Sequence, residues 1–261
     1  MRADQLLVER GLAASRSQAA RLIAAGLRWH DGAAWRSVAK NGDAIPDDAP
    51  IELADAAEAR YVSRGGLKLE GALQAAGLAV QGLRCLDIGQ STGGFTDCLL
   101  QHGAAEVVGV DVGHGQLHAT LRVEARVRCV EKVNARTLVP ADLGLADDAA
   151  AFGLVTGDLS FISLTLVLPA LVRFLAPRGS LLMLVKPQFE LQPGQIGKGG
   201  IVREPALYAE VEQRLRAACA ALGLVVRGWF DSPISGGDGN REFFVWAQPM
   251  AGSAHPTQEA A

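Results

Sequence analysis

Apolar and polar residues follow one pattern before residue 60 and another after it. Over residues 4–26, apolar positions recur at helical spacing, with Ser15 suited to cap a second helix and Gly26 to end it. Residues 27–53 contain short strand-like pieces separated by turn sequences. This part of the chain therefore predicts two helices followed by a small hairpin sheet.

After residue 60, short apolar runs alternate with helical segments. The expected strands are 84–88, 106–111, 127–132, 152–158, 180–186, 224–231 and 242–247, and the expected helices are 66–77, 93–103, 115–121, 163–175 and 204–222. Alternation of this kind is typical of a doubly wound, mostly parallel sheet. Residues 232–240 are too short a connection for a crossover, so the last two strands are predicted to be antiparallel neighbours.

These patterns predict an α/β fold, a Rossmann-like sheet of six parallel strands and one antiparallel strand, with a small α+β domain before it. We expect the small domain and its Ala-rich, acidic linker at residues 1–58, with the linker at 54–58, and the sheet domain at residues 59–248. Residues 249–261 are predicted to be a disordered tail.

Charge is distributed unevenly along the chain. The whole sequence of 261 residues has a net charge of −3, which argues against a general polyanion binder. Residues 1–40, however, carry seven basic residues against Asp4, Glu9 and Asp31. A local basic face in a neutral protein fits nucleic-acid binding, and a merely solvated surface fits the same charges, so both interpretations stay open.

Cysteine and histidine spacing favours neither disulfides nor a metal site. The four cysteines, Cys85, Cys98, Cys129 and Cys219, form no C-x-x-C pair. Cys85 and Cys129 lie in apolar runs, so we expect buried free thiols in a reducing compartment. The sequence shows no secretory signal and no apolar run long enough to span a membrane, which predicts a cytoplasmic protein.

The stretch Leu86–Asp97 indicates a nucleoside-binding site. An apolar run ends in Asp87, and a small-residue turn, Gly89-Gln90-Ser91-Thr92-Gly93, then opens a helix. Asp111 ends the next apolar run, where a ribose diol would be held. The dinucleotide fingerprint G-x-G-x-x-G is absent, so S-adenosylmethionine fits better than a nicotinamide cofactor, and an oxidoreductase is disfavoured.

Topology predicts where the chemistry gathers, because ligands bind at the carboxyl edge of parallel strands. Asp158 ends the fourth expected strand and Lys186 the fifth. Glu242 begins the reversed strand, so its start lies at the same edge. We therefore expect these three side chains to lie together beside the nucleoside pocket and to act in catalysis.

The motifs in this half of the chain also support a family resemblance. The matching blocks are Tyr61–Leu69, Leu86–Leu99, Asp111–Leu117, Asp158–Leu164, Lys186–Glu190 and Gly197–Gly200. With these blocks, over about residues 2–248, the chain resembles the TlyA (hemolysin A-like) family of ribosomal RNA 2′-O-methyltransferases. That family joins an S4 RNA-binding module, which residues 5–53 resemble, to a methyltransferase domain of the FtsJ type.

The resemblance implies a catalytic Lys-Asp-Lys-Glu set. Here these are Lys68, Asp158, Lys186 and Glu242. Lys68 depends mainly on the resemblance, since its position alone also fits a surface lysine. Lys186 is expected to receive or steer the proton of a ribose 2′-hydroxyl, or to stay charged and stabilise the alkoxide; the sequence leaves both open. Asp158 and Glu242 are expected to orient the lysines and the substrate.

The implied cofactor is S-adenosylmethionine, and the implied partner is ribosomal RNA or a ribosomal subunit, with no membrane. Expected cofactor-binding residues are Asp87, Gly89, Ser91, Thr92, Gly93, Phe95, Asp111, Asn134 and Asp158. Asp87 and Gly89 would lie near the methionine part, Asp111 at the ribose and Asn134 near the adenine. For Ser91 to Phe95, a helix cap and a core aromatic explain the residues equally well.

Expected RNA-binding residues are Arg2, Arg16, Arg21, Arg64 and Lys198. Lys198 lies in Gly197–Gly200, which we expect to be either a mobile loop that approaches a phosphate or a simple linker. Gln90 departs from the family, where Ala is usual, and so does Trp29-His30-Asp31 in the hairpin. Two other function classes remain as alternatives: a non-catalytic ribosome-assembly factor, and a membrane-active hemolysin, which requires an export or insertion segment that we do not see.

Overall fold

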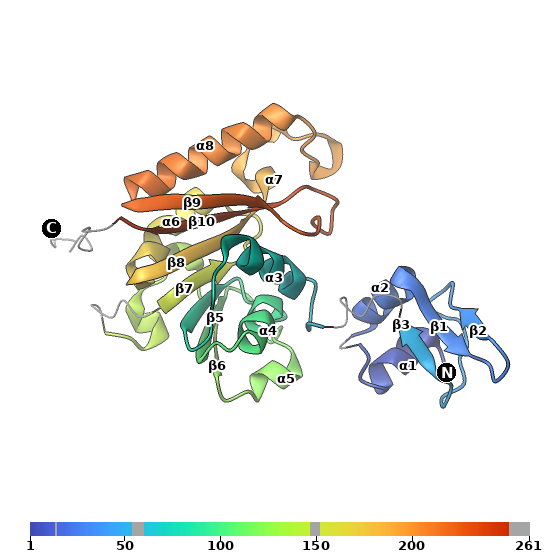
Figure 1. The fold of residues 1–261 in the computed structure, drawn as a ribbon. Helices are drawn as coiled ribbons and strands as arrows, with labels where there is room; N and C mark the ends of the chain where they lie inside the picture. The colour runs from blue at the N-terminus through green and yellow to red at the C-terminus, as the bar shows by residue number, and fades with distance from the viewer. Residues whose placement is uncertain (14, 54–59, 147–151, 251–261) are drawn as a thin grey trace. The chain divides into compact units, whose positions relative to one another are not determined.

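The computed structural model describes residues 1–13, 15–53, 60–146 and 152–250 (Figure 1). The chain divides into two compact units, Met1–Leu67 and Lys68 onward. The expected linker at 54–58 and the expected tail beyond residue 250 lie outside the described residues. The assignment of the first unit to an S4-like RNA-binding domain remains a prediction.

The first unit consists of two helices and a small antiparallel sheet. Its elements are α1 (Ala3–Glu9), α2 (Arg16–Gly26), β1 (Leu27–His30), β2 (Trp35–Ser37) and β3 (Ile51–Leu53), with strand order β2-β1-β3. The Ser15 side chain accepts a hydrogen bond from Gln18 N and caps α2, which ends at Gly26 as predicted. Leu6, Leu7 and Leu22 are buried in a core that is separate from that of the second unit.

The second unit contains a seven-stranded sheet. The strands are β4 (Arg84–Ile88), β5 (Glu106–Asp111), β6 (Val127–Glu131), β7 (Phe152–Gly157), β8 (Leu175–Val185), β9 (Leu224–Asp231) and β10 (Phe243–Pro249). Their spatial order is β6-β5-β4-β7-β8-β10-β9, and β10 runs antiparallel to both of its neighbours. The predicted reversal of the last strand is thus confirmed.

Helices cover both faces of this sheet. They are α3 (Gly65–Ala76), α4 (Gly94–Gln101), α5 (Ala119–Arg122), α6 (Leu164–Leu171), α7 (Pro187–Glu190) and α8 (Pro205–Ala221), with short 3-10 turns η2 (Ala135–Thr137), η3 (Pro140–Leu143), η4 (Val172–Phe174), η5 (Pro193–Gln195) and η6 (Lys198–Gly200). Neighbouring residues of β10 point to opposite faces: the Phe243 ring lies 5.4 Å from that of Tyr208 on α8, and Phe244 stacks on Phe95 of α4. Figure 1 shows α8 along β9 and β10.

Four expectations about this unit are wrong, and one of them is the helix expected over 115–121, which is limited to α5 (Ala119–Arg122). The helix expected over 163–175 ends as α6 at Leu171, and β8 begins at Leu175 rather than at 180. Leu175 pairs with Phe152 across a register shift, so the strand continues through Ala176-Pro-Arg-Gly179, which looks like a loop in the sequence. Cys129 is exposed rather than buried, because β6 is the edge strand of the sheet, whereas Cys85 is buried as expected.

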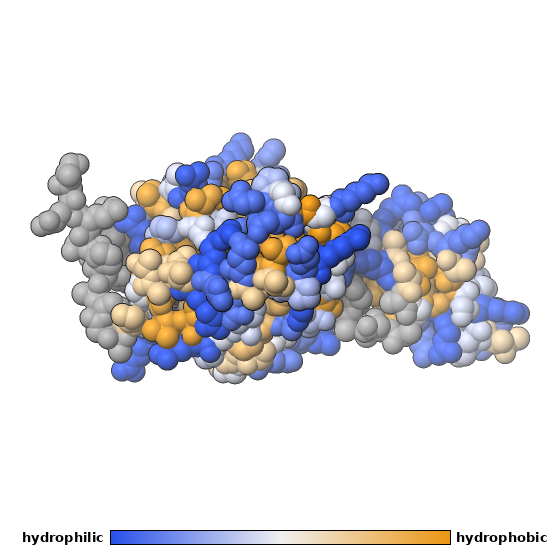
Figure 2. All heavy atoms as spheres, turned by 90° about the horizontal axis from the view of Figure 1, so that it is seen from above, coloured by the Kyte–Doolittle hydropathy of each residue, from blue (hydrophilic) through white to orange (hydrophobic). Residues whose placement is uncertain are grey.

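The surface carries apolar and polar groups together. On the face shown in Figure 2, hydrophobic atoms are interrupted by hydrophilic ones. Among the residues that the structure describes, no helix combines the length and the apolar character needed to cross a bilayer. The same part of the chain contains no group of three or more His, Cys, Asp or Glu residues arranged to hold a metal ion.

Candidate active site

The ends of three strands bring the expected catalytic residues to one edge of the sheet. Asp158 directly follows β7 and Lys186 directly follows β8. Glu242 directly precedes β10, whose first residue, Phe243, lies opposite Val185 in the antiparallel register. Glu242 is therefore carried to the edge where β7 and β8 end. We call Lys68, Asp158, Lys186 and Glu242 the charged cluster.

Lys68 and Glu242 form a buried ion pair. Lys68 Nζ lies 2.6 Å from Glu242 Oε2, and the side chains are 9% and 2% exposed. Burial raises the pKa of Glu242 above its usual value, and the charge of Lys68 opposes that rise. Since Lys68 lies near the start of α3 and Glu242 at the start of β10, the pair ties together two elements that are 174 residues apart.

Lys186 and Asp158 form a second pair that is more open to solvent. Lys186 Nζ lies 2.6 Å from Asp158 Oδ1, with side-chain exposures of 12% and 26%. The same ammonium donates a hydrogen bond to Ser160 Oγ at 2.9 Å. The charges of both residues also act on the Glu242 carboxyl, lowering its pKa through Lys186 and raising it through Asp158. The two pairs therefore form one electrostatic unit.

A buried polar chain runs beneath the glycine-rich turn. Gln90 Nε2 donates to Thr96 Oγ1 at 2.9 Å, and that hydroxyl donates to Asp87 Oδ2 at 2.7 Å. Burial raises the pKa of Asp87 to about 7; the Thr96 hydrogen bond opposes the rise, while repulsion from Asp158 and Asp111 adds to it. Among the described residues, Asp87 Oδ1 and Gln90 Oε1 are buried and accept no hydrogen bond.

Asp111 organises the turn on the other side. Its carboxylate accepts hydrogen bonds from Ser91 N and Gly113 N, each at 2.7 Å, and is only half-buried. Gly89 has a φ of +80°, and a Cβ there would lie 2.7 Å from the carbonyl oxygen of Asp158. Only glycine allows the β4 turn to approach Asp158 so closely.

These residues fit S-adenosylmethionine as the methyl donor. Its sulfonium and ammonium groups are cationic, and Asp87 lies near enough to Asp158 and Asp111 for their negative charges to add to the rise of its pKa. Asp87 Oδ1 is a buried acceptor without a hydrogen-bond donor among the described residues, so a cationic donor group of the cofactor would satisfy it. The half-buried Asp111 carboxylate keeps lone pairs for ribose hydroxyls, the role expected for it from the sequence.

The other expected cofactor residues are placed as follows. Gly93, with a φ of +95°, precedes α4, and Thr92 is exposed beside it. Phe95 is buried, and its ring stacks on Phe244 in the core. The exposed Asn134 uses its side-chain oxygen to accept from Arg136 N and begins the turn η2. Thus, the local cap and core functions of Gly93, Phe95 and Asn134 are visible, while their cofactor contacts stay predictions.

The expected RNA-binding residues belong to both units: Arg2, Arg16, Arg21 and Arg64 to the first, and Lys198 to the second. Arg2 and Arg16 both pair with the buried Asp4, at 3.0 and 2.7 Å. The hydrogen bonds from these two arginines lower the pKa of Asp4 to about 2, so part of their charge is neutralised within the unit. Arg21 Nη1 donates to Ser17 O at 3.3 Å, and Arg64 is half-buried. Lys198 is exposed on the 3-10 turn η6.

Sequence reasoning missed two residues next to Asp158. Ser160 binds the Lys186 ammonium, and Phe161 is 89% exposed with a φ of +63°, which is strained for an aromatic residue. The Phe161 ring lies 5.1 Å from that of Phe189 on α7. Both residues lie inside Asp158–Leu164, one of the blocks that carry the family resemblance, so a signal was present in the sequence. An apolar Phe at such a position, however, predicts a core residue.

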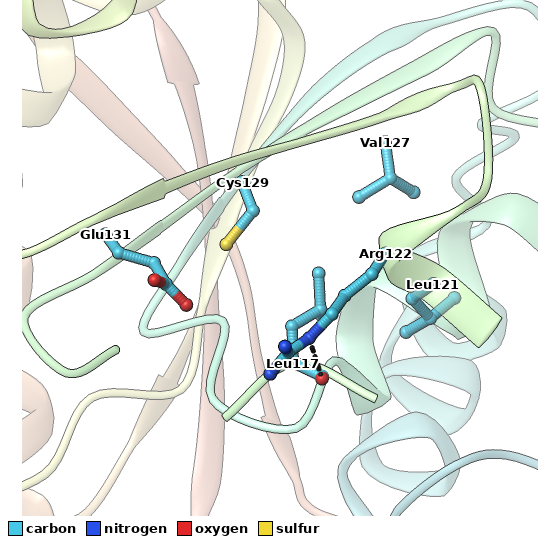
Figure 3. A pocket seen from close by; sticks show the side chains of 6 residues that line it. All are labelled: Leu117, Leu121, Arg122, Val127, Cys129 and Glu131. Atoms are coloured by element: carbon cyan, nitrogen blue, oxygen red, sulfur yellow. Dashed lines mark hydrogen bonds between the residues drawn. The ribbon is translucent and has the colours of Figure 1, made fainter. Parts of the chain in front are cut away.

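A shallow pocket of about 280 Å³ opens beside the edge strand. Figure 3 shows its lining, which comes from the segment before α5, from α5 and from β6: Leu117, Leu121, Arg122, Val127, Cys129 and Glu131. None of the expected site residues lines this pocket. Glu131 lies opposite Asp111 in the parallel register, and its carboxylate accepts from Gly115 N. The pocket therefore adjoins the strand that carries the expected ribose-binding residue.

Comparison with known proteins identifies the family. Residues 61–249 match the FtsJ-like methyltransferase family. The chain is 46% identical to the 16S/23S rRNA (cytidine-2′-O)-methyltransferase TlyA of Mycobacterium tuberculosis, over 97% of this chain and 91% of that protein. Hemolysin A of Brachyspira hyodysenteriae is 37% identical, over 94% of this chain and 98% of that protein.

The solved structure of a Streptococcus thermophilus protein that is named as a hemolysin is similar to this chain along almost its whole length. It is 40% identical, with a TM-score of 0.73 over 98% of this chain and 91% of that one. Together with the geometry of the charged cluster, these matches show that the chain belongs to the TlyA family of FtsJ-like, S-adenosylmethionine-dependent methyltransferases.

Proposed function

We propose that this protein transfers a methyl group from S-adenosylmethionine to the 2′-hydroxyl of a cytidine in ribosomal RNA. The observation that carries the proposal is the pair of Lys–carboxylate contacts at the strand edge, one buried and one open to solvent, each 2.6 Å long. This is the Lys-Asp-Lys-Glu set that the FtsJ resemblance implies. The M. tuberculosis relative supplies the substrate class through its name.

The chain has to provide alignment and charge. When bound, S-adenosylmethionine supplies a methyl group on a positively charged sulfur. The ribose oxygen must be held in line with that methyl carbon at about 3 Å. We assign the contact with the hydroxyl to Lys186, because its side chain is 12% exposed and its ammonium is held by Asp158 and Ser160. For the methyl group to be accepted, the hydroxyl proton would pass to the Asp158 carboxylate or to water, and Lys186, charged beside Asp158, would stabilise the negative charge on the ribose oxygen.

Two exposed side chains of the second unit suit an RNA strand. Phe161 offers an aromatic face on which a base can stack. Lys198 offers a cation for a backbone phosphate. In the first unit, Arg2, Arg16 and Arg21 would add phosphate contacts, which position an RNA rather than read its sequence. We infer that the protein works on ribosomes or their RNA in the cytoplasm.

The decisive experiment transfers labelled methyl groups to ribosomal subunits isolated from cells that lack this protein. Wild type is expected to produce labelled 2′-O-methylcytidine after nuclease digestion. Lys186→Ala is expected to reduce the rate by about 10²–10⁴-fold, because proton handling at the hydroxyl is lost. Its dissociation constant for S-adenosylmethionine should match that of wild type.

The matched control is Arg173→Ala, an exposed cation on η4 ahead of β8 and outside the cluster. This control should keep full activity. Transfer to neither subunit by a wild-type protein that still binds S-adenosylmethionine would contradict the proposal and favour a non-catalytic assembly factor.

A further inference from the structure

The loop between β9 and β10 contains a fully used amide side chain. Asn240 is 1% exposed. Its Oδ1 accepts from Val202 N, and its Nδ2 donates to Gly200 O and to Asp238 Oδ2, each at 2.9 Å. Asn240 therefore binds the backbone of the short segment after Lys198 at two points, Gly200 and Val202.

The same network reaches the segment that carries Lys186. Gln188 on α7 donates through Nε2 to Asp238 Oδ2 at 3.2 Å, the oxygen that Asn240 also contacts. Gln188 is buried and stands two residues after Lys186. Asp238 thus joins the start of α7 to the turn η6 through Asn240.

The loop also packs against the buried ion pair. A Cβ on Gly236 would lie 2.7 Å from Glu242 Oε1, so the backbone at this glycine lies directly against the carboxylate. The other oxygen of that carboxylate binds Lys68. Gly236 N in turn donates to Asn240 O at 2.9 Å. One loop therefore contacts the charged cluster on one side and the Lys198 turn on the other.

Two exposed cations flank the segment held by Asn240. Lys198 lies on η6, and Arg203 directly follows the anchored Val202. Asn240 binds backbone atoms of this segment, Val202 N and Gly200 O. It therefore acts on the positions of the two cations through the backbone that carries them. Because Gly199 and Gly200 have φ values of +77° and +79°, that backbone has a conformation that glycine tolerates freely and that needs outside contacts to stay in one place.

We propose that Asn240 is a positioning residue that holds the Lys198 turn in fixed register with the charged cluster, so that an RNA phosphate bound at this turn sets the place of the ribose at Lys186. The RNA part rests on the proposed function, whereas the holding of the turn is a property of the chain alone. Asparagine is required because it combines one acceptor with two donors, which a carboxylate of the same shape cannot do.

The test uses Asn240→Asp in the full-length protein. The new carboxylate keeps an acceptor for Val202 N, but it loses both donated bonds and faces the oxygens of Gly200 and Asp238. Trypsin cleavage after Lys198, followed by mass spectrometry, should become about tenfold faster, as expected when buried hydrogen bonds of this kind are lost. The KM for RNA should rise about tenfold, with a smaller change in kcat.

Four further variants serve as controls for this test. Gly237→Ala lies in the same loop with open space for a Cβ and should behave as wild type. Asp238→Ala changes an exposed residue and should shift cleavage and KM in the same direction as Asn240→Asp. Lys198→Arg keeps the cation, so combining it with Asn240→Asp should leave the KM for RNA as high as in Asn240→Asp alone. Lys198→Ala should raise the KM for RNA in the wild-type protein and raise it little further in Asn240→Asp.

Additive effects of Lys198→Ala and Asn240→Asp on KM, or unchanged cleavage after Lys198, would overturn the inference. The inference would also be overturned if the only change in Asn240→Asp were a higher dissociation constant for S-adenosylmethionine. If the wild-type protein transfers no methyl group to RNA, the proposed function fails, and the cleavage experiment alone still decides whether Asn240 holds the turn.

Discussion

The two ion pairs of the charged cluster have the same contact distance and different surroundings. Lys68 and Glu242 are almost completely buried, whereas Asp158 is 26% exposed in its pair with Lys186. A buried pair must be complete, because each charge has lost its water. A half-open pair can exchange its partner for a substrate at modest cost. We therefore propose that the first pair holds the site together and that the second pair is the one that faces the substrate.

The largest expected effect comes from breaking the buried pair. Lys68→Met leaves the Glu242 carboxyl without a partner and should lower the free energy of unfolding by about 3–5 kcal/mol. The double variant Lys68→Met/Glu242→Leu should recover most of this loss, since it removes both charges, yet it should stay inactive. Urea denaturation and methyl transfer measure the two effects.

The control for this prediction is the open pair. Asp158→Asn should cost less unfolding free energy than Lys68→Met, because Asp158 is itself partly exposed and the Lys186 ammonium keeps its hydrogen bond to Ser160 Oγ, while methyl transfer is largely lost. If Asp158→Asn destabilised the protein as much as Lys68→Met, the distinction between a structural pair and a substrate-facing pair would be wrong.

A second change sharpens the comparison on the open side. Phe161 lies next to Ser160, the hydroxyl partner of Lys186, and its ring is exposed. Phe161→Ala should raise the KM for RNA about tenfold, the typical effect of losing one base–aromatic stack. Phe161→Tyr should retain wild-type KM. A stability gain in Phe161→Gly, where the positive φ is relieved, would show that the strain is maintained for function.

A third change tests Asp87, a buried carboxyl whose hydrogen-bond partner is the Thr96 hydroxyl rather than a lysine. In the folded state the pKa of Asp87 is raised from its usual 3.8 to about 7. The folded protein therefore binds this proton more tightly than the unfolded chain does. The free energy of unfolding should fall as pH rises from about 4 to 7, by at most about 1.4 kcal/mol per pH unit.

Asp87→Asn should flatten this pH dependence, and denaturation curves from pH 5 to 8 measure the change. Glu190 and Glu242 also have raised pKa values, so a smaller slope of the same sign should remain in the variant. A slope as steep as that of wild type would show that Asp87 does not carry the linkage.

Strand order explains why so much of the cluster could be predicted. Asp158 and Lys186 each end an apolar run, and a short connection forces the run after Glu242 to turn back. Those three facts place the side chains at one edge without any knowledge of packing. Lys68 had no such signal, because its place depends on how α3 packs against the segment between β9 and β10, which contains Pro233 and Glu242, and only the family resemblance pointed to it.

Other features depend on contacts that no local pattern encodes. Cys129 sits in an apolar run, but it is exposed because β6 has a neighbour on only one side. Arg2 and Arg16 look like free surface charges until the buried Asp4 is seen between them. Asn240 looks like an ordinary loop residue, and its importance arises from three partners that lie 2 to 40 positions away in the sequence.

The contact between Lys68 and Glu242 also has a consequence for the timing of synthesis. The partners are 174 residues apart, so a nascent chain carries Lys68 and the whole glycine-rich turn long before Glu242 has been added. Until then the lysine has no carboxylate to face, and the cluster does not exist. A prematurely terminated chain could fold its first strands and remain inert. The charged cluster is therefore complete only after β9 and the loop that follows it have been synthesised.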